Sequence, residues 1–307
     1  MGILHRIVVA TLPLVPRALV ARVARRYIAG ETLAEAVAKA KALREEGCET
    51  TVDVLGEFIT GLDQARATCE DYLRTVRGLR EAGVPANVSV KLTAFGLLLD
   101  EAECLRLVER VAREAAAAGG FLRVDMEDSS CTDATLRVHG ELRARGLPVG
   151  TVLQARLRRT PADAERLAAE GVPIRLCKGI YLEPPAIAHT GREEIRGAFL
   201  EVVGILLRGK GRVAIATHDD RLVEGAERLL ASLAVPRERY EFQMLLGVLP
   251  GLRRSLVAKG HPLRVYVPYG TNWYAYSTRR LRENPEVAGN IVRALFRRGG
   301  RAAPTTR

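Results

Sequence analysis

The sequence predicts an α/β fold, namely a (β/α)8 barrel of the TIM type with N-terminal helices. Eight short β-type runs recur along the 307 residues at intervals of roughly 25–40 residues, and stretches rich in Ala, Leu, Glu and Arg fill the gaps. Nearly all of the runs end in polar or charged residues, and a barrel of this kind carries its functional groups at the C-terminal ends of its strands. The runs lie at residues 50–54, 88–91, 122–125, 151–154, 174–178, 213–218, 240–243 and 264–267.

The barrel accounts for most of the chain. An apolar content of 48% is sufficient for a large core, and no Pro-, Gly- or Ser-rich linker separates two domains. We expect an N-terminal helical segment at 1–45, the barrel at 46–290 and a basic tail at 291–307. An Ala- and Lys-rich helix should begin at Glu31–Thr32 and end near Gly47.

The N-terminal residues and the cysteines indicate the cellular compartment. The apolar residues 7–15 resemble the core of a signal peptide, but prolines interrupt the run and Arg17 follows it at once. No stretch approaches the ~20 apolar residues of a membrane-spanning helix. The five cysteines are scattered and form no CxxC pair, which argues against a disulfide framework or a zinc site. We therefore expect a cytoplasmic protein without a metal centre.

Two neighbouring runs predict which side chains point into the barrel. In the runs at 88–91 and 122–125, apolar residues alternate with polar ones, whereas strands covered on both faces are usually apolar throughout. A charge inside the barrel needs an opposite partner, because burying it alone costs several kcal/mol. Lys91 and Asp125 end these runs at similar heights, so we predict that they pair beneath a charged substrate.

The remaining runs carry polar side chains toward the same rim of the barrel. One polar ending alone would be weak evidence, but a set that converges on one face indicates a binding site. These residues are Gln154, Arg175, Lys178, Thr217, His218, Gln243 and Tyr266.

The net charge of +11 comes mainly from the C-terminal part of the chain. Twelve of the 47 Lys and Arg residues lie within 251–307, against only two acidic residues, Glu283 and Glu286. Nucleic-acid binding is one explanation, although no zinc finger, RNP-type motif or helix-turn-helix supports it. An anion-binding site followed by a solvated or membrane-contacting basic tail explains the same counts.

Known motifs exclude some chemistries and leave one open. No GxGxxG follows a strand and no HExxH occurs, so a Rossmann dinucleotide site and a zinc protease are not indicated. The cationic rim favours a ligand that carries phosphates. Lys178 at a strand end is also a plausible imine-forming lysine, which leaves a Schiff-base aldolase as an alternative enzyme class.

The last run leads into a motif that suits a carboxylate ligand. After Gly270 the chain is expected to form a helix that carries Arg279 and Arg280 side by side, with Glu283 one turn beyond Arg279. Two adjacent guanidinium groups can clamp a carboxylate through charge-assisted bonds. The alternative is an exposed arginine pair with a surface bridge, which would contribute little.

The order of these segments resembles the proline dehydrogenase family, including the flavin-dependent barrel domain of the bifunctional proline utilisation A enzymes. The resemblance runs from about residue 45 to 286. The segments are VSVKLTAFG, VDMEDS, VLQA, RLCKGIY, ATHD, YEFQMLLGV and YVPYG followed by YSTRRLREN.

The resemblance implies a distorted (β/α)8 barrel that binds FAD without a covalent bond. It implies oxidation of L-proline to Δ1-pyrroline-5-carboxylate by hydride transfer to the flavin, with electrons passed to a membrane quinone. A peripheral contact with the inner face of the cell membrane would follow, and no nucleic acid is implied.

The resemblance also assigns roles by position. Arg279 and Arg280 correspond to the pair that grips the proline carboxylate, Lys91 to a lysine beneath it, and Asp125 to the partner of that lysine. The residues that enclose the pyrrolidine ring correspond to Tyr181, Leu245 and Tyr266. The FAD contacts correspond to Gln154, Arg175, Lys178, Gly179, Thr217, His218 and, at the adenosine end, Glu283.

Three positions depart from the family pattern. Arg156 stands where relatives commonly have an aromatic residue, and Ile180 replaces a small one. Leu246 occupies a position that varies between His and Tyr. These departures concern the fine specificity of the site and not the class of reaction.

Overall fold

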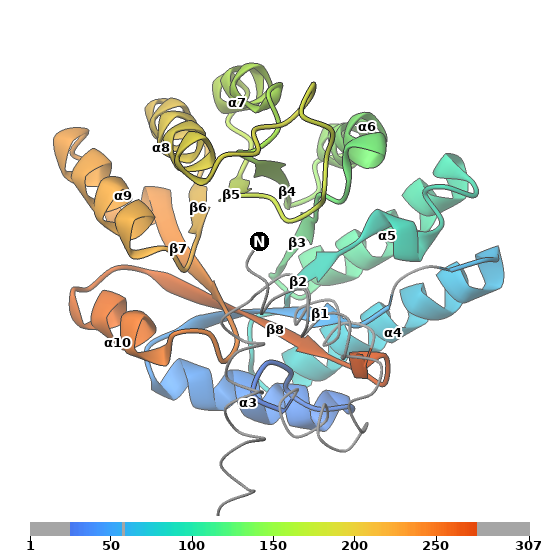
Figure 1. Ribbon diagram of the computed structural model, residues 1–307. Coiled ribbons are helices and arrows are strands. Elements are labelled where there is room, and N and C mark those ends of the chain that lie inside the picture. Colours follow the sequence, from blue (N-terminus) through green and yellow to red (C-terminus); the bar gives the residue numbers. More distant parts are fainter. Residues whose placement is uncertain (1–24, 57–58, 275–307) are drawn as a thin grey trace, which may run out of the picture.

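Eight parallel strands close into a barrel in chain order, from β1 to β8 and back to β1 (Figure 1). The computed structural model describes residues 25–56 and 59–274. All eight predicted runs are strands, so the predicted fold class is confirmed. The strands are β1 (Glu49–Val54), β2 (Asn87–Val90), β3 (Phe121–Val124), β4 (Val149–Gln154), β5 (Ile174–Cys177), β6 (Val213–Ala216), β7 (Tyr240–Leu245) and β8 (Leu263–Tyr269).

Helices surround the strands, as Figure 1 shows. The predicted first helix is present: the side chain of Thr32 accepts from the backbone N–H of Glu35, and the carboxylate of Glu35 accepts from the backbone N–H of Thr32, which forms a capping box. The α-helices of the described residues are α3 (Leu33–Glu45), α4 (Leu62–Glu81), α5 (Glu101–Ala117), α6 (Thr132–Ala144), α7 (Thr160–Ala169), α8 (Arg192–Arg208), α9 (Asp220–Ser232) and α10 (Pro250–Ala258). Short 3-10 helices occur at Leu92–Phe95 (η2), Ser129–Cys131 (η3) and Arg237–Arg239 (η4).

Several predicted features lie outside the described residues. These are the helical segment before residue 25, the basic tail at 291–307, and the motif that contains Arg279, Arg280 and Glu283.

The apolar core lies between the barrel and its helices. Val88, Val90, Leu122 and Val124 are fully buried in it, together with apolar faces of α4 and α5. Ser89, which alternates with these valines, is equally buried, but its hydroxyl accepts from Arg175 of β5, which lies across the barrel. The alternation along β2 therefore separates an outer apolar face from an inner polar face.

A charged layer fills the end of the barrel at which the strands begin. Glu241 of β7 accepts from Arg264 of β8, with 2.9 Å between Oε1 and Nε, and it lies 3.1 Å from Arg212. Arg264 also donates to the backbone carbonyl of Thr50, while Arg123 donates to two carbonyls, those of Thr151 and Pro173. These contacts give each buried charge partners, as burial requires.

Replacing Glu241 with Gln should make the free energy of unfolding less dependent on pH in the acid range. Burial alone would raise the pKa of Glu241, but Arg264 and Arg212 outweigh it and lower the pKa to about 2. Because the folded pKa lies below the unfolded one, the stabilisation is complete above pH ~4.5 and is lost as the pH falls toward ~2. Urea unfolding at pH 6 and pH 3 should show the wild-type protein losing about 2 kcal/mol more than the Glu241→Gln variant. Equal losses of unfolding free energy in the two proteins would contradict the lowered pKa of Glu241.

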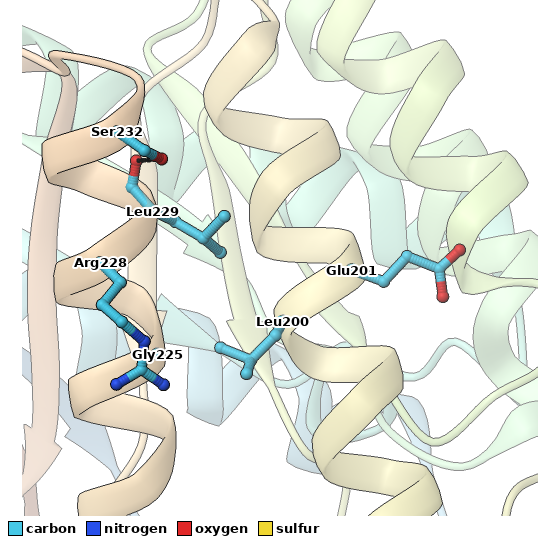
Figure 2. A pocket seen from close by; sticks show the side chains of 6 residues that line it. All are labelled: Leu200, Glu201, Gly225, Arg228, Leu229 and Ser232. Carbon is cyan, nitrogen blue, oxygen red and sulfur yellow. Dashed lines mark hydrogen bonds between the residues drawn. The ribbon is translucent and has the colours of Figure 1, made fainter.

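The outer surface carries a shallow groove between α8 and α9 (Figure 2). Leu200 of α8 and Leu229 of α9 both line it, and a Cβ on Gly225 would come within 2.7 Å of the Leu200 methyl groups. Glu201 turns away from the groove in Figure 2. The absence of a side chain at residue 225 thus lets the two helices pack closely, and the groove lies in the helix layer and not at the strand ends.

Candidate active site

Lys91 follows β2 and forms an ion pair with Asp53 of β1. Its Nζ lies 3.2 Å from Oδ2 of Asp53, and the Asp53 side chain is 1% exposed. The hydroxyl of Tyr72 also donates to Asp53, at 3.1 Å. Burial raises the pKa of Asp53, and the Lys91 ammonium opposes this shift. The predicted pairing of Lys91 with Asp125 is wrong.

Asp125 is bound instead by side chains from β5 and β8, which are not neighbours of β3 in the barrel. Arg175 donates to its Oδ1 at 2.6 Å, and the hydroxyl of Tyr266 on β8 donates to its Oδ2 at 3.0 Å. Arg175 further donates to Gln243 of β7 at 2.5 Å and to Ser89 of β2 at 3.1 Å. A single guanidinium thus joins three other strands or their ends, which explains why Asp125 does not pair with Lys91.

Tyr266 is fixed as a hydrogen-bond donor in this cluster. Burial, followed by the charge of Asp125, raises the pKa of Tyr266 well above its ordinary value. The guanidinium of Arg175 also lies over its ring, 5.3 Å from the centroid. The phenol therefore stays protonated at neutral pH and holds Asp125 in place.

The side-chain amide of Gln154, at the end of β4, lies beside the backbone of Gly179, a residue without a side chain. Gln154 is buried, and its Nε2 donates to the carbonyl of Glu127 at 2.6 Å. Gly179 has a φ of +92°, and a Cβ there would lie 2.9 Å from Oε1 of Gln154 and 2.8 Å from Arg156. The Nε of Arg156 is buried and has no hydrogen-bond partner among the described residues. This region therefore contains the amide of Gln154, the guanidinium of Arg156 and the partly exposed backbone of Gly179.

Gly179→Ala should destabilise the protein by about 1–2 kcal/mol, because the side chain would meet Gln154 and require a backbone conformation disfavoured for alanine. Thermal unfolding followed by circular dichroism would measure this. Gly251→Ala on α10 is the matched control: no atom lies within 4 Å of its Cβ, so that variant should match the wild type or exceed it. Equal melting temperatures for the two variants would refute the packing argument.

The ends of β5 and β6 hold two cations around one carboxylate. Nζ of Lys178 lies 3.1 Å from Asp219, and Arg196 of α8 donates to both oxygens of Asp219, at 2.9 and 3.0 Å. Burial alone would raise the pKa of Asp219, but hydrogen bonds from Arg196 and Lys178 outweigh it and lower the pKa to about 2. Thr217 also accepts from the backbone N–H of Asp219.

His218 and Leu245 connect β6 to β7 at the same rim. Nε2 of His218 accepts from the backbone N–H of Leu245 at 2.9 Å, so the neutral ring carries its proton on Nδ1. Leu245 is the last residue of β7, two residues beyond the predicted end of that strand. Tyr181 lies in the loop that follows β5, and its carbonyl accepts from Arg156.

Most of the predicted site residues within the described part of the chain lie at the carboxyl ends of the strands, whereas Arg175 and Tyr266 lie within β5 and β8 and point into the barrel. Lys91, Asp125 and Tyr266 lie on the side of the barrel that β8, β1, β2 and β3 form. The residues predicted to bind the cofactor lie on β4, β5 and β6 or in the loops that follow them. Two acidic residues of the site, Asp53 and Asp219, were not among the predicted ones. Asp53 lies between Val52 and Val54, in the same alternation that was used for the other strands. Asp219 directly follows His218.

A closed parallel barrel whose strand ends carry paired charges and amides defines a (β/α)8-barrel enzyme. The family profile described as proline dehydrogenase matches residues 36–293. The chain belongs to this family, whose members are flavin-dependent oxidoreductases that act on the CH–NH group of proline. The aldolase alternative is thereby set aside.

Individual relatives agree with this assignment. The chain is 34% identical to proline dehydrogenase of Deinococcus radiodurans over 281 residues, 89% of this chain and 90% of that protein. It is 32% identical to proline dehydrogenase 1 of Bacillus subtilis over 275 residues, 90% and 91% of the two chains.

A solved structure shares the fold. It is proline utilization A (PutA) from Bdellovibrio bacteriovorus inactivated by N-propargylglycine, with a TM-score of 0.79 and 27% sequence identity. The match covers 84% of this chain and 32% of that one, so the chain spans about a third of the larger protein.

Proposed function

We propose that this protein oxidises L-proline to Δ1-pyrroline-5-carboxylate with bound FAD and passes the electrons to a quinone. The observation that carries the proposal is the division of the rim into two chemically different halves. One half holds the Asp53–Lys91 and Asp125–Arg175 pairs, and the other holds amides and cations.

The residues after β4, β5 and β6 fit a flavin nucleotide. Gly179 has no side chain, so its backbone lies directly beside Gln154 and Arg156, and the buried Nε of Arg156 is an unused donor there. Three cations, Lys178, Arg196 and Arg221, share two carboxylates, those of Asp219 and Glu193, which leaves positive charge for phosphates. We propose that Gln154, Arg175, Lys178, Gly179, Thr217 and His218 hold FAD, with Glu283 at its adenosine end.

The charge balance of the other half supports a substrate that brings its own carboxylate. Within residues 25–56 and 59–274, Lys91 is paired with Asp53 and Arg175 with Asp125, so the positive charges of these two ion pairs are balanced. A proline carboxylate therefore needs further cations. Arg279 and Arg280, which lie outside the described residues, supply them in our proposal, while Tyr181, Leu245 and Tyr266 enclose the ring.

The chemistry removes a hydride from a ring carbon and a proton from the amine, which leaves a C=N double bond. FAD, when bound, supplies the acceptor for the hydride and its electron pair. The residues of the chain orient the substrate, since hydride transfer needs the donor carbon within ~3.5 Å of its acceptor. They also exclude water, because Arg175, Gln243 and Ser89 fill the barrel beneath the site.

The proposal is tested by the absorption spectrum of the purified protein. We expect a yellow protein with roughly one FAD per chain, whose flavin bands bleach when L-proline is added without oxygen and return when a soluble quinone is added. A protein that binds no added FAD, or an FAD-loaded sample that L-proline leaves unbleached, would refute it.

Peripheral membrane contact at the inner face of the cell membrane is the second part of the proposal, and exposed apolar side chains on the rim support it. Six of the seven large exposed apolar residues of the described chain lie in loops after β2, β5 and β7; they are Leu98, Leu99, Ile180, Leu182, Ile187 and Leu249. None of the helices of the described residues is long and apolar enough to span a bilayer.

A double variant, Leu98→Ser with Leu182→Ser, should weaken binding to anionic phospholipid vesicles by at least about tenfold, because each leucine side chain contributes about 1.5 kcal/mol or more when buried. Flotation with vesicles measures this. Leu233→Ser is the matched control: Leu233 is exposed but follows α9 at the opposite end of the barrel, so its loss should change nothing. Equal vesicle binding by all three proteins would argue against this contact surface.

A further inference from the structure

The loop that follows β5 is held at its two ends in different ways. This segment, residues 178–191, which we name the Tyr181 loop, runs from β5 to α8. Its far half is tied to the loop after β4: Leu157 and Ala188 form a β-bridge, and the backbone N–H of Arg158 donates to the carbonyl of Ile187 at 2.9 Å. A side chain adds to these backbone contacts, since Nε of Arg158 donates to the carbonyl of Pro185 at 3.3 Å.

The near half, which carries Tyr181, is held at its start by the backbone N–H of Arg156, which donates to the carbonyl of Lys178 at 3.0 Å, and beyond that point by side chains. Arg156 donates from Nη1 to the carbonyl of Tyr181 at 2.5 Å. Two residues later, the Glu183 carboxylate accepts from the backbone N–H of Ser129 at 2.8 Å and from its hydroxyl at 2.6 Å. Ser129 follows β3, so Glu183 reaches past β4 to a second neighbouring strand end.

The position of Ser129 makes this contact favourable. Ser129 begins η3, which leads directly into α6, and the first N–H groups of a helix lack intrahelical partners. A carboxylate at this end satisfies one of them and also interacts well with the partial positive charge there. The residues beside Glu183 do not replace this contact: Leu182 is 89% exposed, and Pro184 and Pro185 have no N–H to donate, although their carbonyls accept from Ile187 and Arg158 respectively.

We propose that Glu183 is a positioning residue, which sets the affinity for proline by clamping the Tyr181 loop onto Ser129. This inference rests on the proposed role of Tyr181 in enclosing the pyrrolidine ring. Without the clamp, the near half loses its contact with the loop after β3 and keeps its contacts with Arg156. The apparent affinity of a site falls in proportion to the fraction of molecules that have the loop in place.

The test is a double-mutant cycle on Glu183 and Ser129. Glu183→Ala should raise the KM for proline by about tenfold, corresponding to a drop in the clamped fraction to about one tenth, with kcat nearly unchanged. Ser129→Ala keeps the backbone N–H and should raise KM by about threefold. The double variant should match Glu183→Ala, because both changes remove one contact.

Two further readouts separate positioning from a general structural effect. Glu183→Gln keeps an acceptor for the N–H of Ser129 and should bring KM back to within about threefold of the wild type. Inhibition by cyclopentanecarboxylate, which has the ring and the carboxylate, should weaken with KM in Glu183→Ala, whereas inhibition by acetate should not change. Glu224→Ala on the exposed face of α9 is the control for loss of one carboxylate and should behave as the wild type.

Two results would overturn the clamp: wild-type kinetics for Glu183→Ala, or a double variant whose effect is the product of the single effects. Equal weakening of acetate and cyclopentanecarboxylate would also overturn it. Failure of the proposed function looks different, because the wild-type protein loaded with FAD would then oxidise no proline at all.

Discussion

Arg175→Met is expected to lower the free energy of unfolding by about 3–5 kcal/mol, because it leaves a carboxylate inside the barrel without its cation. Arg175 is 8% exposed and joins Asp125, Gln243 and Ser89, which lie on or after three other strands. Removing it also leaves Gln243 and Ser89 without this donor, and buried polar groups that lose a partner are costly.

Urea unfolding followed by circular dichroism would measure this loss. Arg221→Met is the matched control, because the side chain of Arg221 is 72% exposed and its ion pair with Glu193 spans 3.5 Å at the surface. That variant should change stability by less than about 1 kcal/mol. Adding Asp125→Asn to Arg175→Met should recover part of the lost stability, because the unpaired charge is then gone. A loss below about 1 kcal/mol for Arg175→Met would contradict the central role of this guanidinium.

Arg279→Met and Arg280→Met should each raise the KM for proline by about 30–150-fold, since each loses a charge-assisted contact of about 2–3 kcal/mol. The reason lies in the described part of the site, where Lys91 and Arg175 already face the carboxylates of Asp53 and Asp125. In the proposed function, the carboxylate of the substrate is a third anion in this half of the rim, and the paired arginines are proposed to offset it.

Steady-state kinetics with L-proline, together with the FAD content of each variant, would measure the effect. Arg254→Met on the exposed side of α10 removes the same charge at a distance and should leave KM unchanged. Unchanged KM in both Arg279→Met and Arg280→Met would exclude the carboxylate clamp. Loss of FAD with an unchanged KM in the refilled protein would assign the arginines to the cofactor instead.

The strands and their inward faces were predictable because their signals are local. Side chains alternate with a period of two along a strand, so Val88, Ser89 and Val90 reveal which face is polar without knowledge of the neighbouring strands. The same alternation placed Asp125 toward the barrel interior. Thr32 and Glu35 likewise form their capping box within four residues of each other.

The partners of these residues were not predictable in the same way. The predicted heights of Lys91 and Asp125 were reasonable, since β2 and β3 pair Val90 with Val124. The choice of partner depends on Arg175, which is separated from Asp125 by 50 residues and crosses the barrel to reach it. Asp53 then remains as the partner of Lys91. The clamp between Glu183 and Ser129 is non-local in the same sense, with 54 residues between its members.

The sequence by itself determined that this chain forms an eight-stranded parallel barrel with a charged rim and that it resembles proline dehydrogenases. It could do so because strand periodicity, capping and motif order are properties of neighbouring residues. Only the tertiary structure decided which carboxylate neutralises which cation and what anchors the Tyr181 loop. Closure of the barrel brings distant strand ends together, and the free energy of each buried charge depends on that arrangement.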